Sequence, residues 1–236
     1  MDKKSRWELA QEYEQNWWKS VRDNVDMTFY ETFAEEVKKL AAPHIKIKSD
    51  TNILEIGSGA AGIITHFKES GERYAIDPLE DLYSSVENFT AYRDETVKYF
   101  NGKGEALPFP NQKFDLILID NVLDHCEDPP QVMNEIKRTL KKNGIVFFRQ
   151  NTYNLWGKFV RRLMEKALID KGHPFTFTKK NLLRKYFQDD YEILFYSRSG
   201  YFKTWVKELT TFNKKNFIKA LLFVTRDKAT YILRKK

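Results

Sequence analysis

A glycine-rich turn and a later carboxylate are the residues best placed to bind a ligand. Gly57, Gly59 and Gly62 fit the pattern G-x-G-x-x-G after a short apolar run, and Asp77 ends a second run about 20 residues on. Glycines in such a turn let a ligand approach the backbone, and the acid accepts hydrogen bonds from ribose hydroxyls. The alternative is an ordinary strand-to-helix loop beside a solvated acid. The order strand, turn, helix, strand and acid favours a nucleoside-bearing cofactor.

Strands that alternate with helices must position this turn. Apolar runs predict five strands, at residues 53–57, 73–77, 97–102, 115–120 and 144–149. The segment that begins at Ala60 is predicted to be helical, with its first free N–H groups facing the ligand. Alternation of this kind indicates an α/β fold, with a mostly parallel, Rossmann-like sheet that has helices on both faces.

The remaining segments are predicted to form one domain around this core. Helices are expected at residues 6–20, 27–42, 129–142, 154–170, 179–187 and, for the most part, 203–226. Two further strands are expected at residues 191–196 and 230–233. We divide the single domain, residues 1–236, into N-terminal helices (1–49), a cofactor-binding core (50–150), a cap or substrate segment (151–188) and C-terminal strands and helix (189–236).

The string LEIGSGAAG resembles the first motif of class I S-adenosylmethionine-dependent methyltransferases, small-molecule type, in which an acid stands two positions before the first glycine. Glu55 occupies that position. The stretches at residues 102–129 and 137–148 resemble later motifs of the same family. A carboxylate would repel the pyrophosphate of NAD, whereas S-adenosylmethionine has no phosphate and carries positive groups. Glu55 therefore disfavours the alternative of an NAD-dependent oxidoreductase. A non-catalytic relative that binds the cofactor or a partner protein is a second alternative.

The resemblance implies a seven-stranded sheet whose last strand is antiparallel, with S-adenosylmethionine as the cofactor. It also implies a set of cofactor-binding residues at the strand ends: Glu55, Gly57, Ser58, Gly59, Asp77, Pro78, Leu79, Gly104, Glu105, Ala106, Asp120 and Asn121. One position departs from the family, because Lys103 stands where an acid often accepts the adenine amino group. Glu105, or the backbone of Gly104 and Glu105, are the substitutes open to this chain.

Transfer to a hydroxyl group needs a base, for which a histidine is suited. His125 resembles a histidine found after the fourth strand in many relatives, and His173 lies in the cap; a loop or helix-capping role is the alternative for each. Candidate substrate residues are two aromatic side chains of the first helix and two residues beyond the fifth strand: Tyr13, Trp17, Arg149 and Tyr153. The alternative for the aromatic pair is core packing. The histidines lack metal-ligand spacing, so no metal is expected.

Charge is distributed unevenly along the chain. Residues 1–150 hold 20 Lys and Arg against 26 Asp and Glu, whereas residues 151–236 hold 20 against 7, a net charge of +13. A basic half suits an anionic or membrane-associated small acceptor, and nucleic acid is possible but not favoured; a merely solubilising surface is the alternative. The single cysteine, and the absence of a long apolar run or a secretion signal, lead us to expect a cytoplasmic protein. The resemblance implies a methyltransferase that acts on a small molecule, lipid or sugar, and we favour oxygen as the nucleophile.

Overall fold

A seven-stranded sheet organises the residues that the computed structural model describes, which are 5–23, 26–167, 169, 172–211 and 213–236. Its strand order is β3-β2-β1-β4-β5-β7-β6. β7 runs antiparallel to both of its neighbours, and the other pairs are parallel. The strands are β1 (Ile53–Ile56), β2 (Arg73–Asp77), β3 (Val97–Asn101), β4 (Phe114–Asp120), β5 (Leu140–Thr152), β6 (Tyr191–Arg198) and β7 (Asp227–Lys235). The predicted fold class is therefore confirmed.

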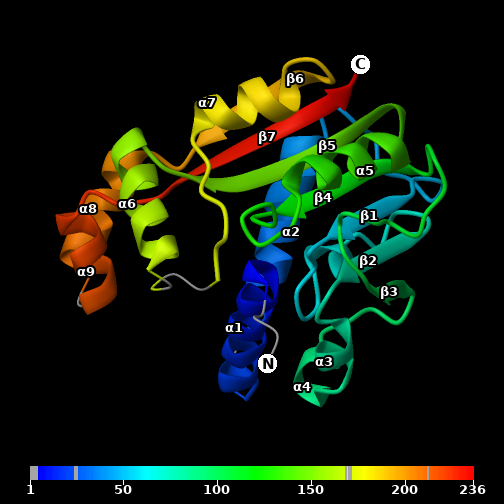
Figure 1. The fold of residues 1–236 in the computed structure, drawn as a ribbon. Helices are drawn as coiled ribbons and strands as arrows, with labels where there is room; N and C mark the ends of the chain where they lie inside the picture. The colour runs from blue at the N-terminus through cyan, green and yellow to red at the C-terminus, as the bar shows by residue number, and fades with distance from the viewer. Residues whose placement is uncertain (1–4, 24–25, 168, 170–171, 212) are drawn as a thin grey trace.

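Helices cover both faces of this sheet, as Figure 1 shows. They are α1 (Arg6–Val21), α2 (Phe29–Ala41), the 3₁₀ helix η1 (Ile63–His66), α3 (Glu80–Ser84), α4 (Glu87–Thr90), α5 (Pro129–Thr139), α6 (Leu155–Lys166), α7 (Lys179–Leu182), the π-helical turn η2 (Leu183–Phe187), α8 (Tyr201–Thr210) and α9 (Lys214–Leu221). None of the described helices combines the length and the apolar character needed to cross a bilayer.

The two faces of β1 explain why the core has two halves. Successive side chains of a strand point to opposite faces. Leu54 and Ile56 join the cluster under α5, α7 and η2, whereas Ile53 joins the cluster under α2 and η1. Glu55 shares the α2 side and is buried there, which is an unusual place for a carboxylate.

Three predicted helices differ from those observed. Gly62 has φ +75° and ψ 152°, which an α-helix excludes, so only the short η1 follows the glycine turn. The helix predicted at residues 129–142 ends at Thr139, because Leu140 is extended and pairs with Phe114 as the start of β5. The segment 203–226 forms α8 and α9 rather than one helix. Asp170, the predicted end of another helix, lies outside the described residues.

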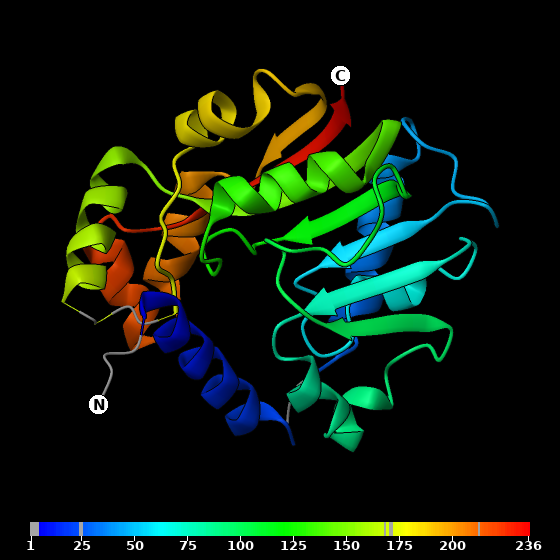
Figure 2. The ribbon, with the colours of Figure 1, turned by 45° about the vertical axis from the view of Figure 1, so that its right-hand side comes forward.

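Helix α1 begins with a capping box and crosses the carboxyl ends of the strands. The Glu8 N–H donates to Ser5 Oγ at 3.2 Å, and the Ser5 N–H donates to the Glu8 carboxylate at 2.6 Å. In Figure 2 the arrowheads of the cyan and green strands point toward the side on which the dark-blue α1 lies. Open α/β sheets bind ligands at this edge.

Candidate functional site

A cavity of about 270 Å³ opens at the carboxyl ends of β1, β2 and β4, beneath α1 and α2. Its wall combines strand ends with aromatic side chains of the two helices. The lining residues that belong to α1 and α2 are Trp7, Gln11, Glu14, Trp18, Phe29, Tyr30 and Phe33. The strand ends and their following loops supply most of the residues expected from the sequence to bind a cofactor.

The glycine turn forms the floor of the cavity and needs glycine for two separate reasons. Gly57 and Gly59 have φ values of +69° and +61°, which side chains other than glycine rarely adopt. A Cβ on Gly57 would also overlap the Val122 side chain. The backbone of the turn is thus exposed to a ligand, as its sequence pattern predicts.

Glu55 stabilises this turn through hydrogen bonds to the residues that directly follow it. Its carboxylate accepts hydrogen bonds from the backbone N–H groups of Ile63 at 3.2 Å and Ile64 at 2.9 Å. The expectation that the first N–H groups after the turn are free for the ligand is therefore wrong. Burial raises the pKa of Glu55 to about 8, and nearby carboxylates add to the effect. Glu55 still lines the cavity, so a cation bound there would lie near its carboxyl group.

Asp77 ends β2 and lies next to the turn. Its oxygens accept hydrogen bonds from the backbone N–H groups of Gly59 at 3.0 Å and Leu79 at 2.9 Å. Each oxygen keeps a second lone pair for a ligand hydroxyl. Burial raises the pKa of Asp77 to about 6. The pKa values of the two buried acids, Glu55 and Asp77, therefore lie on either side of neutral pH.

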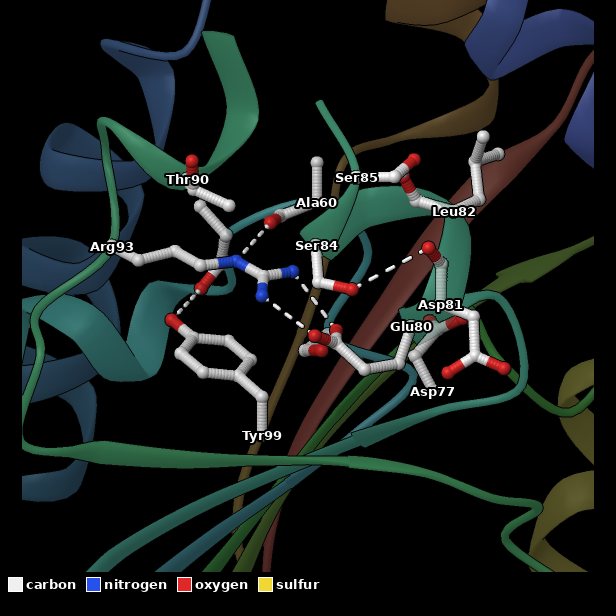
Figure 3. A network of polar contacts seen from close by, with 12 residues as sticks. Ala60, Asp77, Glu80, Asp81, Leu82, Ser84, Ser85, Thr90, Arg93 and Tyr99 are labelled. Atoms are coloured by element: carbon white, nitrogen blue, oxygen red, sulfur yellow. Dashed lines mark hydrogen bonds and ion pairs between the residues drawn. The ribbon is translucent and has the colours of Figure 1, made fainter. Parts of the chain in front are cut away.

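Arg93 and Glu80 brace the turn, although nothing in the sequence singles them out. The Arg93 guanidinium donates to both Glu80 carboxylate oxygens at 2.7 and 2.9 Å and to the Ala60 carbonyl at 2.8 Å. Figure 3 shows this network with Tyr99 alongside, whose ring lies 3.9 Å from the guanidinium carbon. Since the pair is buried, it fixes the carbonyl of the glycine turn to α3.

Lys103, Gly104 and Glu105 also line the cavity. Gly104 and Glu105 are two of the three residues expected along the adenine edge, and Lys103 is the position that departs from the family. Glu105 uses one carboxylate oxygen to accept the backbone N–H groups of Glu127 and Asp128, at 2.8 and 3.0 Å. Its side chain thus anchors the loop before α5. Lys103 lies over the Trp7 ring, with Nζ 3.5 Å from the ring centroid, and pairs with Glu127 at 3.0 Å.

Asp120 and Asn121 close the cavity at the end of β4. The Arg149 guanidinium donates two hydrogen bonds of 2.6 Å to the Asp120 carboxylate. Asn121 has φ +56°, and its side-chain oxygen accepts the backbone N–H of Asn151 at 3.0 Å. Arg149 is therefore occupied with Asp120 rather than pointing at an acceptor.

His125, His173 and Asp124 form a cluster at one side of the cavity. The two imidazole centroids are 4.6 Å apart, and His125 Nε2 lies 3.9 Å from Asp124 Oδ1. The Gln150 side-chain amide donates to the same Asp124 oxygen at 2.7 Å. Ligand atoms of the three clustered residues lie within 4.8 Å of one another, so they could hold a metal ion, which their sequence spacing did not indicate. The backbone N–H of Phe175 bonds to the Asp124 carbonyl and brings the His173 segment here.

Comparison with known proteins shows which family part of this chain resembles. Residues 54–148 match the family described as "Methyltransferase domain". Over these residues the chain is similar to a methyltransferase domain. An uncharacterised methyltransferase of Schizosaccharomyces pombe is 28% identical over 137 residues, which are 52% of this chain and 49% of that protein. An uncharacterised methyltransferase of Bacillus subtilis, YcgJ, is 27% identical over 99 residues, 41% of this chain and 39% of that one. This chain thus spans about half or less of these relatives.

Solved structures share the fold of this chain beyond residues 54–148. The crystal structure of the Bacillus subtilis YcgJ protein superposes with a TM-score of 0.64 at 18% identity, covering 86% of this chain and 98% of that one. A geranyl diphosphate C-methyltransferase from Streptomyces coelicolor also gives 0.64, at 12% identity, covering 86% and 78%. At such identities the likeness concerns the fold alone.

Several residues predicted for the methyltransferase site lie elsewhere. Tyr13 and Trp17 are 46% and 45% exposed and do not line the cavity; a different face of α1 supplies Trp7 and Trp18 instead. Tyr153 lies outside the lining, where its ring centroid is 4.6 Å from the carbon of the Arg161 guanidinium. The cavity lining also omits three more predicted site residues, namely Ala106, Arg149 and His173.

Proposed function

We propose that this chain binds S-adenosylmethionine in the cavity and transfers its methyl group to a small acceptor. Acidic side chains in the lining carry the proposal: among the described residues the lining holds Glu14, Glu55, Asp77, Glu105 and Asp120 against one Lys or Arg, Lys103. Arg149, outside the lining, pairs with Asp120. The acidic set fits a ligand with a sulfonium and an ammonium group and would repel a pyrophosphate. It therefore supports a methyltransferase over an NAD-dependent oxidoreductase.

The shape and partners of the lining also fit this cofactor. Gly57 and Gly59 allow close backbone approach, and Asp77 keeps lone pairs for two ribose hydroxyls. Tyr30 contributes an aromatic ring to the lining, and aromatic rings attract a positive sulfur. The Phe33 ring also lies in the lining but has the Arg149 guanidinium over it, with the guanidinium carbon 3.6 Å from the ring centroid. Bound S-adenosylmethionine supplies a methyl group already activated by that positive sulfur. The geranyl diphosphate C-methyltransferase of the same fold is described in complex with S-adenosylhomocysteine, which is consistent with this proposal.

For the acceptor we propose a hydroxyl group on a small molecule, lipid or sugar. His125 lines the cavity, and Asp124 lies close enough to stabilise an imidazolium there. The histidine would take the hydroxyl proton as the oxygen bonds to the methyl carbon and the carbon–sulfur bond breaks, with the sulfur leaving as a neutral thioether. His173 would orient the His125 ring or assist the proton transfer, because the two ring centroids are 4.6 Å apart.

A labelled-methyl transfer assay tests this function. Lysate fractions divided into lipid, glycan, nucleic acid and small-molecule pools are incubated with the chain and methyl-labelled S-adenosylmethionine. We expect label in a lipid, glycan or small-molecule pool, and a loss of at least about 100-fold in rate for His125→Gln with cofactor affinity retained. His66→Gln is the control, because His66 lies on η1 outside the cavity lining. Label in no pool, although the cofactor binds, would contradict methyl transfer.

A further inference from the structure

Three helices on one side of the molecule expose large apolar side chains. α6, α8 and α9 lie together at the left of Figures 1 and 2. Eleven such side chains on or directly after these helices are 44–80% exposed. We call this surface the apolar–basic face; its most exposed members are Leu155, Phe202 and Leu221. Contiguous exposed apolar surface marks an interaction site more often than isolated residues do.

Helix α6 is turned so that its apolar stripe points away from the protein. Trp156, Phe159 and Leu163 follow helical spacing and are 51–55% exposed. Gly157 and Arg161 are buried instead. A helix that only served the core would have the opposite orientation, so the outward stripe requires another explanation.

Helix α8 repeats this arrangement. Phe202 and Val206 are 76% and 52% exposed, with Lys203 and Lys207 beside them, while Glu208 is buried. The Glu208 carboxylate accepts a hydrogen bond of 2.7 Å from Thr225 Oγ1. The acid is thus on the inside and the apolar and basic residues are on the outside.

Hydrogen bonds join the three helices into one surface. The Trp156 indole N–H donates to the Leu222 carbonyl at 2.9 Å, which ties α6 to the end of α9. The Trp205 indole N–H donates to the Ala220 carbonyl at 2.9 Å, which ties α8 to α9. The apolar side chains are therefore presented together rather than on independent segments.

The same helices are strongly basic. α6, α8 and α9 contain nine Lys and Arg against two Glu. Neither Glu offsets the positive charge at the surface of these helices, because Glu208 is buried and Glu165 forms an ion pair with Arg6 at 3.0 Å. A partner for this surface must accept apolar side chains and carry negative charge.

We propose that the apolar–basic face docks on the surface of an anionic lipid bilayer. Aromatic and aliphatic residues flanked by Lys and Arg are typical of helices that lie in a membrane interface. Lysine is depleted from protein–protein interface cores, and a second copy would bring two basic faces together. Nucleic acid would leave the aliphatic side chains without a partner. The proposal is independent of the acceptor and of methyl transfer.

Vesicle flotation of the full chain, without cofactor, tests this proposal. The vesicles are phosphatidylcholine alone, or phosphatidylcholine with about one-third phosphatidylglycerol. We expect binding only to the anionic vesicles, and release as salt rises from about 0.1 M to about 1 M. Equal binding to both vesicles, or no binding to either, would overturn the proposal. A dimer that depends on Phe202, without vesicle binding, would also overturn it and assign the face to a protein partner.

Matched variants locate the contact. Lys203→Glu with Lys207→Glu should weaken partitioning at least about 30-fold, since each basic residue near the bilayer contributes about fivefold. Lys39→Glu with Lys68→Glu, exposed lysines outside these helices, is the control and should change partitioning far less.

The apolar contribution is tested separately. Leu155→Gln with Phe202→Gln should weaken partitioning to the anionic vesicles at least about tenfold. Tyr92→Gln with Ile193→Gln is the control, because these apolar residues are exposed elsewhere on the protein, and it should change partitioning far less. Melting temperatures check folding; if the apolar variant unfolds, the lysine pair decides. An equal loss in target and control variants would refute docking through this face.

Discussion

The affinity for S-adenosylmethionine should rise steeply with pH, because Glu55 must ionise to face a cation and Asp77 must ionise to accept hydrogen bonds from the ribose hydroxyls. Burial raises the pKa of Glu55 to about 8 and that of Asp77 to about 6. A bound cation favours the carboxylate form of Glu55, and hydrogen bonds from bound hydroxyls favour that of Asp77, so binding releases protons. Below these pKa values each bound proton must be removed, which weakens binding; the effect disappears as pH rises above them.

The expected change is large enough to measure. If both acids are fully ionised in the complex, linkage predicts about 300-fold tighter binding at about pH 7.5 than at about pH 5.5. In this range the ammonium group of the cofactor remains mostly protonated, since α-amino groups titrate near about 8. With Glu55→Gln only Asp77 contributes, and the change falls to about fourfold.

Titration calorimetry across this range, in two buffers of different ionisation enthalpy, checks both affinity and proton release. We expect about one proton released near pH 6.5 for the wild type and about one-quarter for Glu55→Gln. Affinity that is flat or falls with rising pH would refute the reasoning. Melting temperatures with and without cofactor establish that the variant is folded.

Three further predictions concern the turn, its brace and the helix above it. Gly57→Ala should destabilise the chain by about 2–4 kcal/mol in urea unfolding, because the new Cβ would overlap Val122. Gly200→Ala should cost only about 1–2 kcal/mol, because Gly200 also has a positive φ of +89° but its Cβ would make only an ordinary contact with Lys203. Equal costs would contradict the overlap with Val122. Arg93→Met should lower the free energy of unfolding by about 3–5 kcal/mol, because it leaves the buried Glu80 unpaired. Lys98→Met, the control, breaks an exposed ion pair and should lower it by at most about 1 kcal/mol. A loss below about 1 kcal/mol for Arg93→Met would contradict the bracing role. Trp7→Ala should weaken cofactor binding about tenfold and Trp17→Ala less than about twofold in equilibrium dialysis, and the reverse order would place the other side of α1 over the cavity.

The sequence predicted the strands and the glycine turn because their signals are local. β2 begins and ends at the predicted residues, and Gly57 and Gly59 adopt the conformations that their pattern requires. The partner of Glu55 was not predictable in this way. It depends on Gly62 breaking the expected helix, which brings the N–H groups of Ile63 and Ile64 onto the carboxylate.

Long-range contacts account for the rest of the candidate site. His173 reaches His125 because its segment bonds to Asp124 and forms a bridge between Thr152 and Phe177, which no local pattern indicates. Helix α1 has aromatic residues on more than one side, so spacing alone could not decide which side covers the cavity.

The most direct test of the central claim compares two nucleoside cofactors by titration calorimetry. If the acidic cavity selects a sulfonium cofactor, S-adenosylmethionine should bind the purified chain and NADH should not. Asp77→Ala should lose the binding of S-adenosylmethionine, because the carboxylate is expected to hold the ribose hydroxyls. Binding of NADH without binding of S-adenosylmethionine would contradict the account.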